Sequence, residues 1–137
     1  MFDLPITATT AAILALMMFP LTMIVSLKRI EIGKSAGNLT EAAIGEYDDE
    51  TLKRRIRAFG SFIEYVPMCL VMMVLLELGG GASKLLWATG LALVVGRVIH
   101  AGGMLYATNP AVRASGMMLT YFVFVAPAVW ILYSVVL

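Results

Sequence analysis

Residues 54–67 read RRIRAFGSFIEYVP, and this stretch decides how the rest of the chain can fold. It carries three arginines into the start of a long apolar segment and then places a carboxylate, Glu64, inside that segment. A charged side chain at the centre of a membrane helix costs about 2.5–3.5 kcal/mol, so such a residue marks a functional site by default. Arg97 and His100 lie inside another apolar segment. We therefore expect Glu64 to pair with Arg97 below the membrane surface.

The composition is that of a membrane protein. The chain has 137 residues, of which 61% are hydrophobic and 14% charged, and its mean hydropathy is +0.91. A soluble domain would carry about 25% charged residues. A helix of about 20 residues crosses a hydrocarbon core of about 30 Å, and four segments qualify: residues 6–27, 58–78, 85–107 and 114–137. Lipid offers no hydrogen-bond partner to an unpaired backbone N–H or C=O group, so each span must be helical. We expect one four-span membrane domain over residues 1–137.

The remaining residues form one polar link, 28–57, and two short turns. The acidic run 48–50 is typical of a helix start, because carboxylates favour the positive end of a helix, so the second helix should begin near Asp49. The acids of the link are better explained as a solvated loop than as a metal site, and we predict no metal. The net charge of +1 gives no indication of a nucleic-acid partner.

The second and third spans are joined by a glycine-rich turn, residues 79–81. Glu77 and Lys84 flank this turn and are expected to pair at the surface, where ion pairs contribute little. In the third span, Ala92 and Gly96 form a small-xxx-small pair, which favours close contact with another helix.

The distribution of Lys and Arg predicts the orientation, because these residues favour the cytoplasmic side. Seven basic residues lie in the first link and its helix ends: Lys28, Arg29, Lys34, Lys53, Arg54, Arg55 and Arg57. The link between the third and fourth spans leads into Arg113, whereas the opposite side has only Lys84. We therefore place both basic links in the cytoplasm and both termini on the non-cytoplasmic side.

The ionisable residues of the second and third spans lie at similar predicted depths. At a rise of about 1.5 Å per residue, Glu64 and His100 lie roughly 10 Å, and Arg97 roughly 15 Å, from the cytoplasmic ends of their helices. Spacings of three and four place four side chains on one side of the second helix: Arg54, Arg57, Ser61 and Glu64. With Arg113 at the same membrane face, the prediction is a basic vestibule with Glu64, Arg97 and His100 beneath it.

Two interpretations of this cluster remain open. In the first, Glu64 and Arg97 are a structural lock between two helices, and His100 donates to a carbonyl. In the second, the arginines form an anion pocket, since guanidinium groups bind carboxylates through paired hydrogen bonds. Glu64 alone cannot neutralise four arginines, so the surplus charge calls for anions. The basic rim can also be ordinary membrane anchoring.

The two motifs in this region resemble those of the MAPEG family, the membrane-associated proteins in eicosanoid and glutathione metabolism. The motifs are residues 57–67, RAFGSFIEYVP, and residues 96–101, GRVIHA. The resemblance covers nearly the whole chain and is strongest to the compact bacterial branch. It implies a trimer of four-helix bundles in a membrane, here the bacterial inner membrane, with glutathione bound between subunits near the cytoplasmic side.

The resemblance also implies residue roles. The matched ligand-binding positions are Arg54, Arg57, Ser61, Glu64, Arg97 and His100, and Arg113 matches the arginine that favours the thiolate, the attacking form of a thiol. The chain departs from the family at three polar positions. The usual His-x-Asn of the first motif is Phe59-Gly60-Ser61, and Met104 replaces a frequent tyrosine.

The sequence therefore predicts an all-α integral membrane four-helix bundle that assembles as a trimer. The expected function is binding of glutathione, as co-substrate, or of a similar small anionic thiol beside a lipophilic molecule, with conjugation of the two as the reaction. The alternative is a non-catalytic membrane protein whose Glu/Arg/His cluster is a structural lock or holds a lipid head group. A small transporter is less favoured, since there are no inverted repeats.

Overall fold

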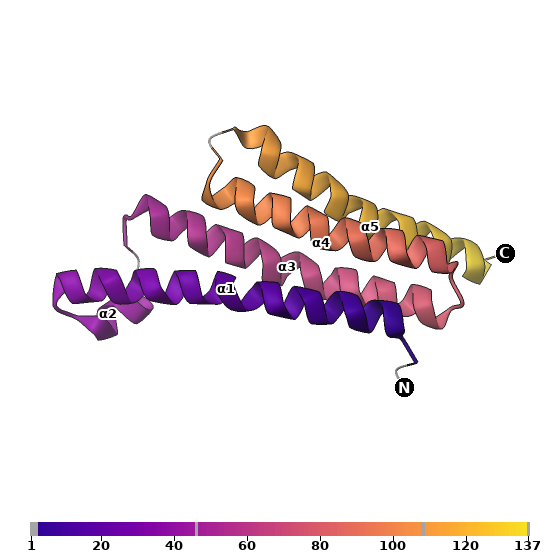
Figure 1. The fold of residues 1–137 in the computed structure, drawn as a ribbon, viewed down its shortest axis with the longest axis horizontal. Helices are drawn as coiled ribbons and strands as arrows, with labels where there is room; N and C mark the ends of the chain where they lie inside the picture. The colour runs from indigo at the N-terminus through magenta and orange to yellow at the C-terminus, as the bar shows by residue number, and fades with distance from the viewer. Residues whose placement is uncertain (1–2, 46, 108, 137) are drawn as a thin grey trace.

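The computed structural model describes residues 3–45, 47–107 and 109–136, with the backbone alone for Glu41 and Ala42. This described part is helical apart from short turns (Figure 1). The helices are α1 (Pro5–Ala36), α2 (Leu39–Ile44), α3 (Glu50–Leu78), α4 (Ser83–Leu105) and α5 (Pro110–Val136). The four long helices are apolar and long enough to cross a membrane. The predicted all-α membrane bundle is confirmed.

The helices extend beyond the apolar spans on the side of the polar link. α1 continues past Leu27 to Ala36, where Gly37, with a φ of 72°, ends it in the left-handed conformation. The polar link, residues 28–57, is therefore largely helical. The solvated loop expected before Asp49 is wrong for much of its length, because helical hydrogen bonding continues into the aqueous region. The third span ends at Leu105 rather than Ala107. The predicted end of the fourth span, Leu137, lies outside the described residues.

The four long helices run antiparallel to their neighbours in the order α1, α3, α4, α5 (Figure 1). α1 also contacts α4, and α3 also contacts α5, so the helices close into a bundle. α2 folds back along the distal end of α1 (Figure 1). The start of α1 and the end of α5 both lie at the opposite end of the bundle (Figure 1). All the basic links thus share the end that carries α2.

The start of α3 follows the sequence prediction. Asp49 is the N-cap residue, and its side chain accepts a hydrogen bond from the Leu52 backbone N–H at 2.7 Å. This bond satisfies one of the free N–H groups of the first helical turn. The bond from Leu52 lowers the pKa of the Asp49 carboxyl below its ordinary value of 3.8. The cap fixes the turn of α3 that carries the basic residues.

Glu77 joins the end of α3 to the start of α1. Its two carboxylate oxygens accept hydrogen bonds from the backbone N–H groups of Ile6, at 3.0 Å, and Thr7, at 2.8 Å. The predicted pairing of Glu77 with Lys84 is therefore wrong. The first turn of α1 has free N–H groups and a positive dipole, and both attract the carboxylate.

α4 and α5 meet at close range through glycines. A Cβ atom at Gly116 would lie 2.6 Å from the Gly96 carbonyl oxygen and 2.6 Å from the His100 backbone nitrogen. A Cβ at Gly103 would lie 2.9 Å from the Arg113 nitrogen. The predicted close contact at Gly96 is confirmed, and it brings the backbone of α5 against the part of α4 that carries Arg97 and His100.

Candidate functional site

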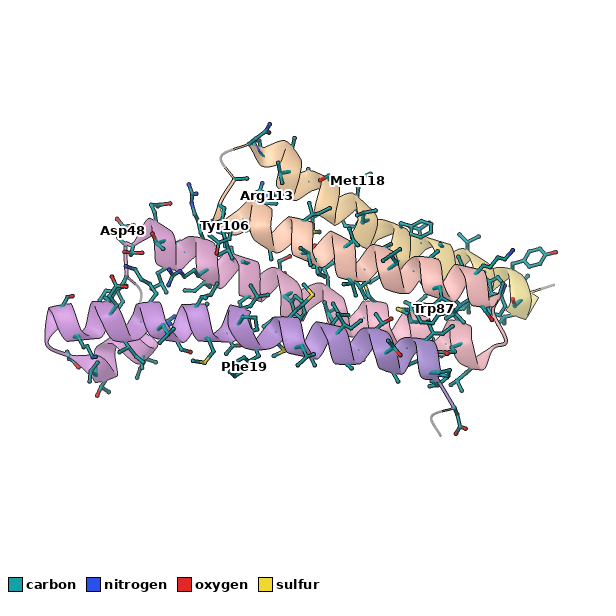
Figure 2. All side chains as sticks on the ribbon, in the orientation of Figure 1. Phe19, Asp48, Trp87, Tyr106, Arg113 and Met118 are labelled. Carbon is teal, nitrogen blue, oxygen red and sulfur yellow. The ribbon has the colours of Figure 1, made fainter. Side chains whose placement is uncertain are left out.

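A cavity of about 430 Å³ opens at the α2 end of the bundle, between the first turns of α3 and the link from α4 to α5. Its lining residues are Glu50, Lys53, Arg54, Arg57, Gly103, Met104, Ala107, Asn109, Pro110 and Arg113. Three of them are the arginines predicted for the basic rim. Figure 2 labels Arg113 and Asp48 at this end of the bundle and Trp87 at the other. The fold therefore gathers distant basic residues around one opening.

The three rim arginines, Arg54, Arg57 and Arg113, carry no carboxylate partner within the described part of the chain. Arg113 makes one weak contact, from Nη1 to the Met104 sulfur at 3.6 Å. The acid of the cavity, Glu50, lies 3.5 Å from the Lys53 amine. The lining thus carries a surplus of positive charge, and its arginines are free to bind an anion.

Arg97 is held inside the helix bundle by neutral groups. Its side chain is 1% exposed, and Nη1 donates to the carbonyl and hydroxyl oxygens of Ser61, both at 3.3 Å. Nη2 donates to the Thr120 hydroxyl at 2.5 Å and contacts the Met117 sulfur at 3.2 Å. The guanidinium carbon lies 5.7 Å from the centre of the Tyr65 ring, at a distance suited to a cation–π interaction. Its Nε has no partner among the described residues.

The predicted Glu64–Arg97 pair is absent from the described part of the chain. Glu64 is exposed and belongs to none of its ion pairs. Arg97 meets α3 at Ser61, three residues before Glu64, but a similar predicted depth does not fix helix rotation. Glu64 lies two residues after the buried Phe62, and is thus turned about 200° away from it around the helix. Ser61, not Glu64, faces Arg97, and the predicted Glu/Arg lock within one chain is wrong.

His100 connects α4 to the start of α5. Its Nδ1 lies 3.1 Å from the Arg113 carbonyl oxygen. A carbonyl only accepts, so Nδ1 carries the proton and donates to it. The predicted carbonyl partner of His100 is confirmed, and the bond fixes the turn from which the Arg113 side chain extends.

The structure thus divides the predicted residues into three groups. Arg54, Arg57 and Arg113 line the cavity; Ser61, Arg97 and His100 form a layer beneath it; and Glu64 faces outward. Sequence reasoning missed Tyr65, Met117 and Thr120 as the neighbours of Arg97. The four-residue spacing of Gly116 and Thr120 on one side of α5 was an available signal, because small and hydroxyl residues line helix contacts in membranes.

Comparison with known proteins identifies the family of this chain. The chain matches the MAPEG family over residues 7–133. It is 30% identical over 79 residues to the Inner membrane protein YecN of Escherichia coli (strain K12), and to the protein of the same name from Escherichia coli O6:H1 (strain CFT073). These alignments cover 58% of this chain and 60% of each relative. No solved structure matches. With its four apolar helices, this chain is an integral membrane protein that belongs to the MAPEG family.

Proposed function

We propose that this protein binds glutathione, or a similar small anionic thiol, in the cavity at the α2 end and conjugates it to a lipophilic electrophile. The observation that supports the proposal most is the group of three arginines, Arg54, Arg57 and Arg113, which line one cavity without a carboxylate partner in the described part of the chain. The cavity volume of about 430 Å³ falls in the range of small-molecule sites.

The chemistry of glutathione matches the charges of this lining. The tripeptide has two carboxylates, an ammonium group and a thiol. Arg54 and Arg57 would bind carboxylates through paired hydrogen bonds. Glu50, which lines the same cavity, would accept from the ammonium group. Arg113 would stabilise the thiolate, which attacks the electrophile while the displaced group leaves with the electron pair of the broken bond.

The residues beneath the cavity act as supports in this proposal. His100 holds the backbone of Arg113, and Arg97 holds Ser61 and Thr120. Ser61 already accepts from Arg97, so its hydroxyl is engaged within the subunit. Phe59 packs against the core, and Met104 offers Arg113 only a thioether. These three departures from the family pattern leave the rim arginines as the main contacts to a tripeptide.

We further propose that the protein forms a trimer in a bacterial inner membrane, with the cavity end in the cytoplasm, both termini outside and lipid around the subunits. The bias of Lys and Arg toward the α2 end supports this orientation. The name of the matched relative, an inner membrane protein, supports the location. A trimer would place part of a neighbouring subunit at the cavity, so that the thiol site lies between subunits.

Thermal unfolding of the lipid-stripped protein in neutral detergent, with and without millimolar glutathione, tests the binding step. A ligand present at about 100 times its Kd stabilises the folded state by about 2.7 kcal/mol, so we expect a clear rise in Tm. Arg113→Ala and Arg57→Ala should reduce the rise. Lys84→Ala, which removes a basic side chain at the opposite end of the bundle, should retain it.

Conjugation is tested separately with a lipophilic aryl halide and glutathione in proteoliposomes. We expect product formation above the uncatalysed rate, lost in Arg113→Ala and partly restored in Arg113→Lys. The absence of both a Tm rise and product with the wild-type protein would refute the proposal. A Tm rise without product would retain the binding site and refute the reaction.

A further inference from the structure

A second cavity, of about 400 Å³, adjoins the first and reaches α1 instead of α5. It is lined by Ile24, Glu50, Thr51, Arg54, Arg55, Leu105 and Tyr106. Glu50 and Arg54 line both cavities, whereas the other five residues line only this one. Its walls therefore come from α1, the first turns of α3 and the end of α4. The function proposed above makes no use of Arg55 or Tyr106.

The position of this cavity coincides with the edge of the apolar spans. Leu105 ends α4, and Ile24 lies one turn before Lys28, the first basic residue of α1. Toward the membrane centre, α1 and α4 carry exposed apolar side chains, among them Met23 and Val98. Tyr106 is 83% exposed, and tyrosine is enriched at the membrane interface. Figure 2 places Tyr106 at the end of α4, beside the start of α3.

The lining combines fixed and free positive charge with apolar walls. Arg55 Nη1 donates to the Ile24 carbonyl at 2.9 Å, which holds its guanidinium between α1 and α3 and leaves its other N–H groups for a ligand. Arg54 has no ion-pair partner in the described part of the chain. The negative charge of Glu50 is offset by Lys53 at 3.5 Å. The site calls for an anion attached to an apolar group.

We propose that this cavity binds the phosphodiester of an anionic phospholipid, with Arg54 and Arg55 on the phosphate oxygens and Tyr106 at the head group. Guanidinium groups bind phosphate through paired hydrogen bonds. Basic pockets between membrane helices on the cytoplasmic side are suited to anionic head groups. Ile24 and Leu105 contact the start of the acyl chains, which a free phosphate ion lacks. Arg54 lines both cavities, so glutathione and the phospholipid would share this arginine. Arg55 and Tyr106 do not line the first cavity, so their variants test the phospholipid site separately from the proposed thiol chemistry.

The test uses the full-length protein, stripped of lipid in neutral detergent, and three probes at equal concentration: short-chain phosphatidylglycerol, phosphatidylcholine with the same chains, and inorganic phosphate. Thermal unfolding measures the response, and native mass spectrometry counts the lipids retained per chain. We expect phosphatidylglycerol to raise Tm and to remain bound, and the other two probes to leave Tm unchanged. An equal response to phosphatidylcholine or to phosphate alone would overturn the proposal.

Two variants with matched controls locate the site. A basic residue near the membrane surface contributes about five-fold to anionic-lipid affinity, so Arg55→Gln should weaken phosphatidylglycerol binding by about that factor. Lys84→Gln, at the other end of the bundle, should leave it unchanged. If Arg55→Gln fails to fold, Tyr106→Ala decides, because this exposed side chain is free to change: it should weaken binding, and Trp87→Ala, an exposed aromatic at the opposite end, should not. Full affinity in both Arg55→Gln and Tyr106→Ala would refute the site.

Discussion

At the scale of single residues, the guanidinium of Arg97 is the buried charged group that most needs hydrogen-bond partners. It is buried among apolar helices with hydroxyl, carbonyl, thioether and aromatic neighbours, and no carboxylate of the described chain reaches it. Removing one partner of a buried charged group costs more than a typical hydrogen bond, because the group left behind has lost its solvation. The neutral partners of Arg97 are therefore important for stability.

This argument predicts a large effect for Thr120→Val. The Thr120 hydroxyl accepts from Arg97 and donates to the Gly116 carbonyl at 3.1 Å. We expect the free energy of unfolding to fall by about 1–3 kcal/mol, measured by denaturation in mixed micelles.

Thr22→Val is the matched control for Thr120→Val. The Thr22 hydroxyl also donates to the carbonyl four residues before it, Met18, at 3.0 Å, but it is exposed and has no buried charge beside it. Its substitution should change stability by less than about 0.5 kcal/mol. Equal effects of the two variants would mean that Thr120 contributes nothing through Arg97.

At the scale of helices, the contact between α4 and α5 controls the position of Arg113. Gly116→Ala would press a methyl group against the Gly96 carbonyl oxygen and the His100 backbone nitrogen, both 2.6 Å from the new Cβ. Backbone atoms cannot rotate away, so the helices must separate. We expect a loss of about 1–3 kcal/mol in unfolding free energy, as for other overpacked cores, together with a weaker response to glutathione.

Gly102→Ala tests whether that effect comes from the contact or from glycine itself. A Cβ at Gly102 would meet nothing within 4 Å, although the residue lies in α4 near the same contact. Alanine favours the helix by up to about 1 kcal/mol over glycine. This variant should be as stable as the wild type or more stable. A loss comparable with that of Gly116→Ala would contradict the close-contact argument.

The first turn of α3 gives a pH-dependent prediction. The pKa of Asp49 is lowered in the folded state by the bond from Leu52, so its contribution to stability is complete above the ordinary value of 3.8 and is lost as the pH falls through the lowered value. Asp49→Ala should therefore speed amide exchange in the first turn of α3 at neutral pH. The difference from wild type should shrink as the pH falls below 3.8 and through the lowered pKa of Asp49. Asp49→Asn keeps a hydrogen-bond acceptor, so its amide exchange should remain close to that of the wild type at neutral and at acidic pH.

At the scale of the whole molecule, the fold could be predicted from hydropathy, since four long apolar segments leave only helices as solutions. The rim could be predicted because charge and helical spacing place Arg54, Arg57 and Arg113 at one membrane face, and the structure brings them to one cavity. The partner of Arg97 could not be predicted from the sequence. In a membrane span both the lipid side and the core side are apolar, so the pattern does not reveal which side faces inward. Depth therefore matched Glu64 to Arg97, while rotation separated them.

The exposure of Glu64 bears on assembly. An ionisable side chain facing lipid would cost up to about 2.5–3.5 kcal/mol, the value at the centre of the membrane, and the cost is avoided if this face of α3 meets another subunit. We therefore expect the proposed trimer to bury the side of α3 that carries Glu64. Glu64→Trp should disrupt it, because a bulky ring in that contact would hold the subunits apart.

Native mass spectrometry in mild detergent measures the number of chains in the assembly directly. The wild-type protein should appear at three times the 14.8 kDa mass of the chain, and Glu64→Trp should shift the population toward single chains. Leu16→Trp on α1, at a position that is 77% exposed, places the same ring on a different outer face and should leave the trimer intact. If both variants remain trimeric, Glu64 lies outside the subunit contact, and a different partner must account for a carboxylate on the membrane surface of α3.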